Sequence, residues 1–330
     1  MYVLGIETSC DETSCAIVRK RKVLSNVTVS SLKFHKKYGG IIPEIATRNH
    51  VKAIDSVFKK AVASAHLRLS RISAISVTCR PGLVGALVVG VNFSKALAVA
   101  LNKPLVGINH LHAHLFAPFL NNNIKIPFPF LGLVVSGGHT ELFVVKDFDR
   151  IKSVGKTRDD AAGEAMDKVG RVFGLGYPGG VYIDRIFDYK HRESFNFRCT
   201  APALDFSFSG IKTALVYKKL ELEKKKFFSS KTKVKLLSSF EESVVTTIVD
   251  NAILAAKKYN LRAIVCGGGV ISNSRLRVLL KQKVSENKIR LFLPPKRFCS
   301  DNAAIVAGLG FYLYNIKKRY GSLDFEVSSN

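Results

Sequence analysis

The sequence predicts an α/β protein in which one structural unit occurs twice. Residues 2–18 (YVLGIETSCDETSCAIV) have the pattern of a strand, a turn of small polar residues and a second strand. Residues 130–145 (FLGLVVSGGHTELFVV) repeat this pattern about 130 residues later. Between and after these hairpins, apolar strand patterns alternate with helical ones, which is typical of the α/β class. We therefore infer an internal duplication.

The turn of each hairpin is rich in Gly, Ser and Thr, whose backbone N–H groups and hydroxyls can surround phosphate oxygens. The first turn also contains two acids, Asp11 and Glu12. Two carboxylates in a phosphate-type loop repel phosphate unless a cation or a proton intervenes. We therefore expect Asp11 and Glu12 to supply a general base or to position a metal-bound water, with a purely structural role in the loop as the weaker alternative.

A long apolar segment follows the predicted strand at 72–79 and the turn after it. It runs from Leu83 to Leu101 and approaches the ~20 residues that span a bilayer. Asn92, Ser94 and Lys95 lie near its middle, where polar groups in a membrane would be costly. We therefore expect a buried helix and no membrane association.

Residues 108–118 (INHLHAHLFAP) contain three of the eight histidines at alternate positions. A helix, turning about 100° per residue, places His110 and His114 on one face and His112 nearly opposite, whereas a strand places all three on one face. Imidazoles four residues apart on a helix can present two nitrogen ligands to one metal ion. Core histidines bonded to backbone carbonyls explain the segment alone equally well.

A third glycine-rich loop lies at 263–280 (AIVCGGGVISNSRLRVLL), again after an apolar strand and before a helix. Consecutive glycines let the backbone approach a flat ligand or a phosphate closely. Three such loops at strand ends predict two related lobes that close on a nucleotide-like ligand.

Composition indicates a globular protein of the cytoplasm. With 330 residues, 47% hydrophobic and 23% charged, the chain can bury two cores without disulfides. The six cysteines are scattered without a CxxC pair, and the first residues lack the basic-then-apolar pattern of a signal peptide. We expect a reducing, cytoplasmic environment.

The formal charge of +26, from 51 Lys and Arg against 25 Asp and Glu, creates a field that attracts polyanions such as nucleic acid. Because the excess is spread along the chain, a generally basic surface explains it equally well. Its densest cluster, residues 217–235 (YKKLELEKKKFFSSKTKVK), is most simply a solvated helix face and loop, and secondarily an RNA-contacting arm.

Nine motifs, in order, resemble one known family over nearly the whole chain. They are GIETSCDETS (5–14), GGIIPEIATRNH (39–50), NHLHAH (109–114), LVVSGGHTEL (133–142), DDAAGEAMDKVGR (159–171), GYPGG (176–180), FSFSGIKTAL (206–215), GGGVISN (267–273) and CSDNAAIVA (299–307). The family is the tRNA threonylcarbamoyladenosine transferases in their bacterial form, TsaD, of the actin-like ATPase superfamily. The resemblance implies two duplicated actin-like (ribonuclease H-like) lobes, 1–115 and 116–330, with a nucleotide and metal cleft between them.

The resemblance implies one divalent metal ion on His110, His114 and Asp301, with Fe²⁺ favoured over Zn²⁺. Neutral imidazoles suit either ion, and three protein ligands leave positions open for substrate. By local sequence alone, Asp301 or Ser300 is more simply the N-cap of the helix that follows. His112 is expected not to be a ligand.

The resemblance also implies which residues bind the nucleotide part of the substrate: Val134, Val135, Ser136, Gly137, Gly138, Asp167, Gly180, Asp184 and Asn273. Each has a plainer explanation. Asp167 could be a surface acid paired with Lys168 or Arg171, the glycines could be turn residues, and Asn273 could simply cap a helix.

The implied activity is transfer of the threonylcarbamoyl group from threonylcarbamoyl-adenylate to the exocyclic amine of the adenosine next to the anticodon, in tRNAs that read codons starting with A, with release of AMP. The implied partners are tRNA, an upstream synthase that makes the adenylate, an inactive actin-like paralogue (TsaB-like) and a small ATPase (TsaE-like). Whether ATP also binds is left open.

Three other functions compete with this one. A small-molecule kinase of the actin-like superfamily would share the loops but has little use for the histidine pair. A zinc protease of the HExxH type needs Glu after the first histidine, where this chain has Leu111. A non-catalytic RNA-binding subunit would explain the charge but not three nucleotide-type loops.

Overall fold

The computed structural model describes residues 1–120, 125–317, 323 and 325–329. Their contacts divide the chain into two compact units, one comprising Met1–Ile126, Asp147–Arg150 and Pro294–Asn330, and the other comprising Pro127–Lys146 and Ile151–Leu293. The expected lobes, 1–115 and 116–330, assigned the C-terminal segment to the second lobe. In the structure this segment belongs to the first unit, because α10 (Ala303–Phe311) packs against β1, β2 and β4.

The first unit is built on a five-stranded sheet in the order β3-β2-β1-β4-β5. β1 pairs antiparallel with β2 and β2 with β3, whereas β4 is parallel to both β1 and β5. The strands are β1 (Tyr2–Glu7), β2 (Glu12–Arg19), β3 (Lys22–Ser30), β4 (Ile72–Arg80) and β5 (Leu105–Asn109). The predicted hairpin at 2–18 and the strand at 72–79 are therefore present.

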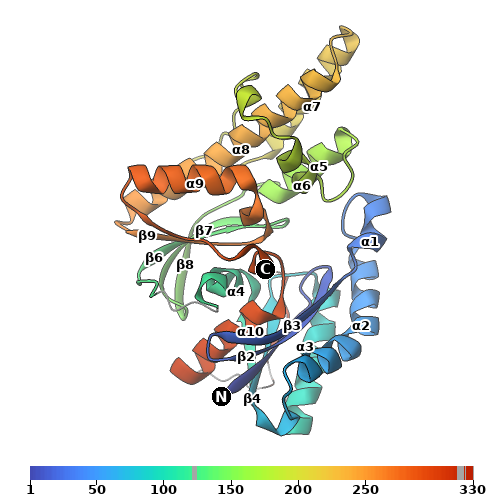
Figure 1. Ribbon diagram of the computed structural model, residues 1–330, viewed down its shortest axis with the longest axis vertical. Helices are drawn as coiled ribbons and strands as arrows, with labels where there is room; N and C mark the ends of the chain where they lie inside the picture. Colours follow the sequence, from blue (N-terminus) through green and yellow to red (C-terminus); the bar gives the residue numbers. More distant parts are fainter. Residues whose placement is uncertain (121–124, 318–322, 324, 330) are drawn as a thin grey trace. The chain divides into compact units, whose positions relative to one another are not determined.

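Helices cover both faces of this sheet (Figure 1). Along β1, Leu4 and Ile6 pack in one cluster with residues of α2 and α3, whereas Val3 packs with Ala307 of α10. This alternation explains why β1 is apolar at successive positions, as expected for a strand buried on both faces. The remaining elements of this unit are α1 (Leu32–His35), α2 (Pro43–Ser64), α3 (Val84–Leu101), α4 (His110–Phe116), short 3₁₀ turns and a π-helical turn at Tyr312–Ile316.

The second unit repeats the same sheet plan, with the strand order β10-β9-β6-β7-β8. β6 pairs antiparallel with β7 and parallel with β9, and β9 is parallel to β10. These strands are β6 (Phe130–Val135), β7 (Thr140–Asp147), β8 (Arg150–Lys156), β9 (Ala263–Gly267) and β10 (Arg290–Phe292). Because β6 to β10 occupy the places of β1 to β5, the predicted duplication is confirmed.

The core of the second unit lies between β6 and its helices. Leu131, Leu133 and Val135 share one apolar cluster with the long buried face of α8. The helices are α5 (Ala162–Val172), α6 (Gly179–Ile186), α7 (Ser209–Lys224), α8 (Ser230–Lys258) and α9 (Ser274–Glu286).

Helix α3 differs from the expectation of a buried helix. Among the described residues, it is the helix long and apolar enough to cross a membrane. Its Ala86, Leu87 and Val91 are buried, in a unit where α3 packs on β4 and α2. The same helix exposes Val84 and, with 66% of its surface accessible, Val99. The helix is therefore buried on one side only and leaves an apolar stripe outside.

A substitution at Gly5 tests how closely α10 packs on β1. A Cβ at this position would lie 2.3 Å from the carbonyl oxygen of Ala303 and 2.7 Å from the backbone nitrogen of Ala307. We predict that Gly5→Ala destabilises the protein by about 1–3 kcal/mol, because overpacking forces the backbone apart. Gly210→Ala is the control: this glycine is in α7 and a Cβ there meets nothing within 4 Å, so stability should rise by about 0.5–1 kcal/mol. Urea unfolding measures both, and an unchanged midpoint for Gly5→Ala would contradict the packing.

Candidate metal centre and glycine-loop site

Helix α4 begins at His110, one of the three expected metal ligands. The Asn109 side chain accepts hydrogen bonds from the backbone N–H groups of Leu111 (2.9 Å) and His112 (3.1 Å), and so caps the helix. The segment is therefore a helix, and His110 and His114 share a face with their ring centroids 4.6 Å apart. His112 lies outside this pair, as the helical phase predicts.

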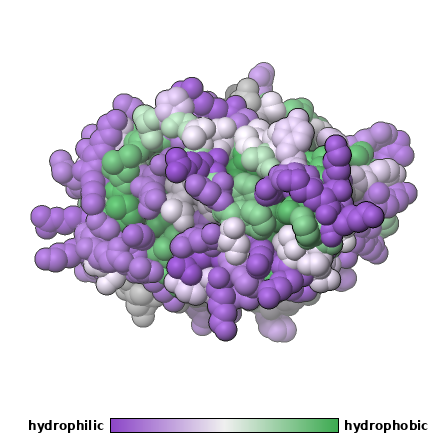
Figure 2. Space-filling view, turned by 90° about the horizontal axis from the view of Figure 1, so that it is seen from above, coloured by the Kyte–Doolittle hydropathy of each residue, from purple (hydrophilic) through white to green (hydrophobic). Residues whose placement is uncertain are grey.

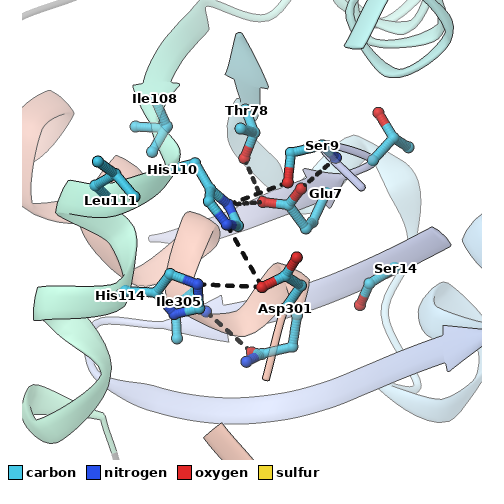
Figure 3. Close-up of polar contacts among 12 residues, drawn as sticks. Glu7, Ser9, Ser14, Thr78, Ile108, His110, Leu111, His114, Asp301 and Ile305 are labelled. Atoms are coloured by element: carbon cyan, nitrogen blue, oxygen red, sulfur yellow. Dashed lines mark hydrogen bonds and ion pairs between the residues drawn. The ribbon is translucent and has the colours of Figure 1, made fainter. Parts of the chain in front are cut away.

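A carboxylate from the far end of the chain meets the two imidazoles (Figure 3). Asp301 Oδ1 lies 3.1 Å from His114 Nε2 and 3.4 Å from His110 Nε2. The plainer expectation was that Asp301 or Ser300 caps α10. Instead Asn302 is the N-cap, accepting from the backbone N–H groups of Ala304 and Ile305, which leaves the Asp301 carboxylate directed at the histidines.

Glu7 was not among the expected site residues, yet it contacts His110 at the ring nitrogen that faces away from Asp301. Glu7 Oε2 lies 3.1 Å from His110 Nδ1 and accepts a 2.6 Å hydrogen bond from the Thr78 hydroxyl, while Oε1 accepts from the backbone N–H of Ser9. Glu7 is fully buried at the end of an apolar strand. That placement, a charge within a strand buried on both faces, is the signal in the sequence that could have identified it.

The charges of these four side chains shift one another's pKa values. Burial opposes charge on His110, but the carboxylates of Asp301 and Glu7 outweigh it and raise its pKa well above the usual value. Burial likewise disfavours charge on Asp301, yet His110 and His114 keep the pKa of its carboxyl well below normal. Burial and the neighbouring His110 lower the pKa of His114. The centre is thus a buried cluster in which anionic carboxylates require a positive partner.

The donor set fits a divalent metal ion. The ligand atoms of His110, His114 and Asp301 all lie within 4.8 Å of one another. With Glu7 at its Nδ1, His110 presents Nε2 towards His114 and Asp301, which is the carboxylate–histidine arrangement found around metals. His112 has its pKa lowered to about 4 by burial and by Arg80, and it is not part of this group.

The two acids of the first loop lie beside this cluster. Ser30 donates a 2.8 Å hydrogen bond to Asp11 Oδ2, and Ser31 donates to the Asp11 carbonyl oxygen. Burial, reinforced by the carboxylates of Asp301 and Asp11, raises the pKa of Glu12 well above normal. Asp11 is therefore anchored by hydroxyl groups, and the protonated form of Glu12 is favoured relative to an exposed glutamate.

In the second unit, glycines let two other segments approach the loop that follows β6 closely. Ser136 and His139 close this loop through a 2.8 Å backbone hydrogen bond. A Cβ on Gly163, in the first turn of α5, would lie 2.6 Å from Ser136 O, and a Cβ on Gly268 would lie 2.3 Å from Val135 O. Gly137 and Gly138 have open space at the same position. The structure therefore places Ser136, Gly137 and Gly138 in the loop against α5 and the third glycine loop, whereas Val134 and Val135 are buried residues at the end of β6.

The remaining expected binding residues also have structural partners. Asp167 accepts a 3.1 Å hydrogen bond from the Gly180 N–H, and it does not pair with Lys168, which bonds Asp160 and Glu164. Asp184 accepts from the backbone N–H and the hydroxyl of Ser274. Asn273 caps α9 by accepting from Leu276 N–H, as its plainer explanation predicted.

Glu241 is a second residue that sequence analysis missed. It is fully buried, its Oε1 accepts a 2.6 Å hydrogen bond from Asn273 Nδ2, and its Oε2 bonds to no described group. Burial, with the carboxylates of Asp184 and Glu242 nearby, raises its pKa to about 8. The sequence could have revealed this buried acid, because Glu241 has helical spacing with Val244, Val245 and Ile248 on the buried face of α8.

Together, these features define a class: a duplicated actin-like α/β fold with glycine loops and a candidate metal centre. Component A of (R)-2-hydroxyglutaryl-CoA dehydratase from Acidaminococcus fermentans has this fold, with 14% sequence identity and a TM-score of 0.56 over 97% of this chain and 100% of that one. In this chain, two histidines and one aspartate that could hold a metal ion lie together within the first unit.

Sequence comparison then gives the family. The model for TsaD, tRNA N6-adenosine threonylcarbamoyltransferase, matches residues 22–308. The transferase of that name from Thermosipho africanus is 45% identical over 95% of this chain and 94% of its own length, and that from Protochlamydia amoebophila is 43% identical over 99% and 96%. This chain belongs to the TsaD family, which favours a transferase over an actin-like kinase.

The raised pKa of Glu241 has a consequence for stability. An unfolded Glu ionises near pH 4.5, whereas the folded protein keeps this proton until about pH 8. Its contribution to stability is therefore present below about pH 4.5 and is lost as pH rises towards 8. We predict that Glu241→Gln, which keeps the acceptor for Asn273 but cannot ionise, matches wild type near pH 4.5 and exceeds it by a few kcal/mol near pH 8, on the order of 1.4 kcal/mol per pKa unit.

The control for this prediction is the adjacent Glu242, which forms two 2.6 Å hydrogen bonds to Arg275. Glu242→Gln should lower stability at both pH values, because it breaks an ion pair. Urea titrations at pH 5 and pH 8 supply the comparison. If the gain of Glu241→Gln does not grow with pH, Glu241 is ionised in the folded protein.

Proposed function

We propose that this chain transfers a threonylcarbamoyl group from threonylcarbamoyl-adenylate to the exocyclic amine of an adenosine next to the anticodon of tRNA. The observation that carries the proposal is the buried cluster of His110, His114 and Asp301 in a chain that the TsaD family model matches over residues 22–308. We propose that these three residues hold the metal, Fe²⁺ in preference to Zn²⁺, and that Glu7 orients His110.

The reaction is acyl transfer. The amine nitrogen bonds to the carbamoyl carbon, the bond from that carbon to the phosphate oxygen breaks, and AMP leaves. The bound metal supplies a positive charge that offsets charge developing on the oxygens. The amine must lose a proton, for which Asp11, held by Ser30, is the candidate acceptor, and Glu12, whose carboxyl pKa is raised by burial, is the candidate proton donor.

The adenylate is assigned to the second unit. We propose that residues 134–138, the end of β6 and the loop after it, contact the adenylate, with the N–H groups of Gly137 and Gly138 at the phosphate, and that Asp167, Gly180, Asp184 and Asn273 contact the nucleoside. The support is the close packing of this loop with Gly163 and Gly268, which leaves Gly137 and Gly138 open to a ligand. Asp184 and Asn273 also fix the start of α9, so ligand contacts there would be made by side chains that are already oriented.

We further propose that the exposed stripe of α3 binds the actin-like paralogue, and that the synthase and the small ATPase act in the same pathway. Val84, Val88 and Val99 are exposed and lie within about 60° of one another around the helix. Such an apolar stripe on an otherwise basic protein is typical of an interface. Localisation in the cytoplasm is part of this proposal, since tRNA and these enzymes work there.

Removing the histidine pair tests the transferase function. We predict that His110→Ala and His114→Ala lose bound metal and at least about 100-fold in activity, because a ligand and the charge balance are lost. His112→Ala, two residues from either ligand, should keep both. Metal analysis of the purified protein, and mass spectrometry of modified adenosine formed with the partners, tRNA, threonine, bicarbonate and ATP, with and without chelator, provide the measurements. Full activity of the chelated or doubly substituted protein would contradict the proposal.

A charge on the α3 stripe tests the proposed interface. We predict that Val99→Lys abolishes complex formation with the paralogue, because a lysine would be buried without a partner. Val278→Lys on α9, where Val278 is 56% exposed, is the matched control and should leave binding intact. Size-exclusion chromatography with the paralogue measures this, and equal binding by both variants would rule out the stripe.

A further inference from the structure

The second unit carries a projection that neither the metal centre nor the glycine loops use. α7 and the first turns of α8 extend beyond the rest of this unit (Figure 1). No residue from 216 to 235 is buried; the last buried residue of α7 is Leu215 and the first of α8 is Leu236. At 1.5 Å per residue, α7 continues roughly 13 Å past Leu215. We call residues 216–235 the arm.

Positive charge in the arm exceeds what its own acids can balance. Residues 217–235 contain eight lysines and two glutamates. Glu221 already accepts from Lys218 and Lys225, each at 2.8 Å, and Glu223 accepts from Lys219 at 2.7 Å. Both acids are therefore engaged by lysines of the same segment.

Three other lysines of the arm have free ammonium groups. Lys224, Lys226 and Lys231 are exposed, and their side chains form no hydrogen bond or ion pair with any residue that the structure describes. Lys226 has a φ of +58°, where the chain turns out of α7, and its neighbour Phe227 is 69% exposed. The end of the arm thus presents three unpaired cations and an exposed aromatic ring within residues 224–231.

Unpaired lysines beside an exposed aromatic ring are better explained by RNA binding than by exposure to solvent alone. Lysines close together repel one another, and an exposed ring gains nothing from solvent, so neither stabilises the fold. Phosphates neutralise such lysines, and unpaired bases of RNA loops stack on aromatic side chains. Figure 2, seen from the side on which this end of α7 lies, shows hydrophilic side chains projecting around smaller apolar patches. An acidic protein segment would use the charge but offers no base to stack.

We propose that the arm is an RNA-binding element, in which Lys224, Lys226 and Lys231 contact phosphates of tRNA and Phe227 stacks on an unpaired base. The proposal rests on the tRNA-modifying function proposed above and adds to it the surface that holds the RNA.

The test measures tRNA affinity as a function of salt for the full-length chain with its partner subunits. The charge variant combines Lys224→Ser, Lys226→Asn and Lys231→Ser, with Asn chosen because it tolerates positive φ. We expect the slope of log K against log salt to fall by about 2–3, near 0.9 for each lost phosphate contact, and affinity to fall at least about tenfold at physiological salt. Phe227→Ser should weaken binding by about 5- to 100-fold with no change in slope.

A matched control removes equal charge elsewhere in the same unit. Lys257, Lys281 and Lys288 are exposed, two of them lie in helices, and Lys288 has a φ of +55° like Lys226. Lys257→Ser, Lys281→Ser and Lys288→Asn together should change the slope by less than about 1.

Three results would overturn the arm proposal: an unchanged slope in the charge variant, an equal loss in the control, or loss of partner-subunit binding with tRNA affinity retained. Failure of wild type to bind or modify tRNA would instead overturn the proposed function. Melting temperatures of all variants establish that each is folded.

Discussion

The contact between β1 and α10 is the constraint on which the candidate metal centre depends. Because Gly5 has no side chain, the backbone of α10 at Ala303 and Ala307 lies directly against the strand. Ser14 of β2 adds a hydrogen bond to the N–H of Ala303. Asp301, two residues before, is thereby placed beside the carboxyl ends of β1 and β5, where Glu7 and His110 emerge. Chain ends that are distant in sequence thus form one site.

Charge balance explains why this cluster is built as it is. Glu7 and Asp301 are carboxylates in a water-poor environment, and each must have a positive partner or hydrogen-bond donors. His110 lies between them and contacts one with each ring nitrogen. Without a metal, a proton on His110, whose pKa is raised well above normal, would supply the charge; a bound divalent ion would supply it instead, with Nε2 as one of its ligands. The same geometry therefore accommodates both states.

The second unit uses its polar side chains differently. Asp184 and Asn273 hold the start of α9, and Glu241 fixes the amide of Asn273 from the buried face of α8. A ligand that contacts these residues meets groups whose orientation is already set, which reduces the entropy lost on binding. The cost is a buried carboxyl on Glu241 that must stay protonated.

Local pattern determined much of this protein. Strand and turn periodicity specified the duplicated hairpins, and helical phase separated His112 from His110 and His114, because both depend only on neighbouring residues. Tertiary structure alone decided that Asp301 faces His114, 187 residues away, while Asn302 takes the cap. It also decided that Glu7 supports His110, that α10 joins the first unit and that α3 is buried on one side. These outcomes depend on which distant surfaces pack together, and local sequence does not record that.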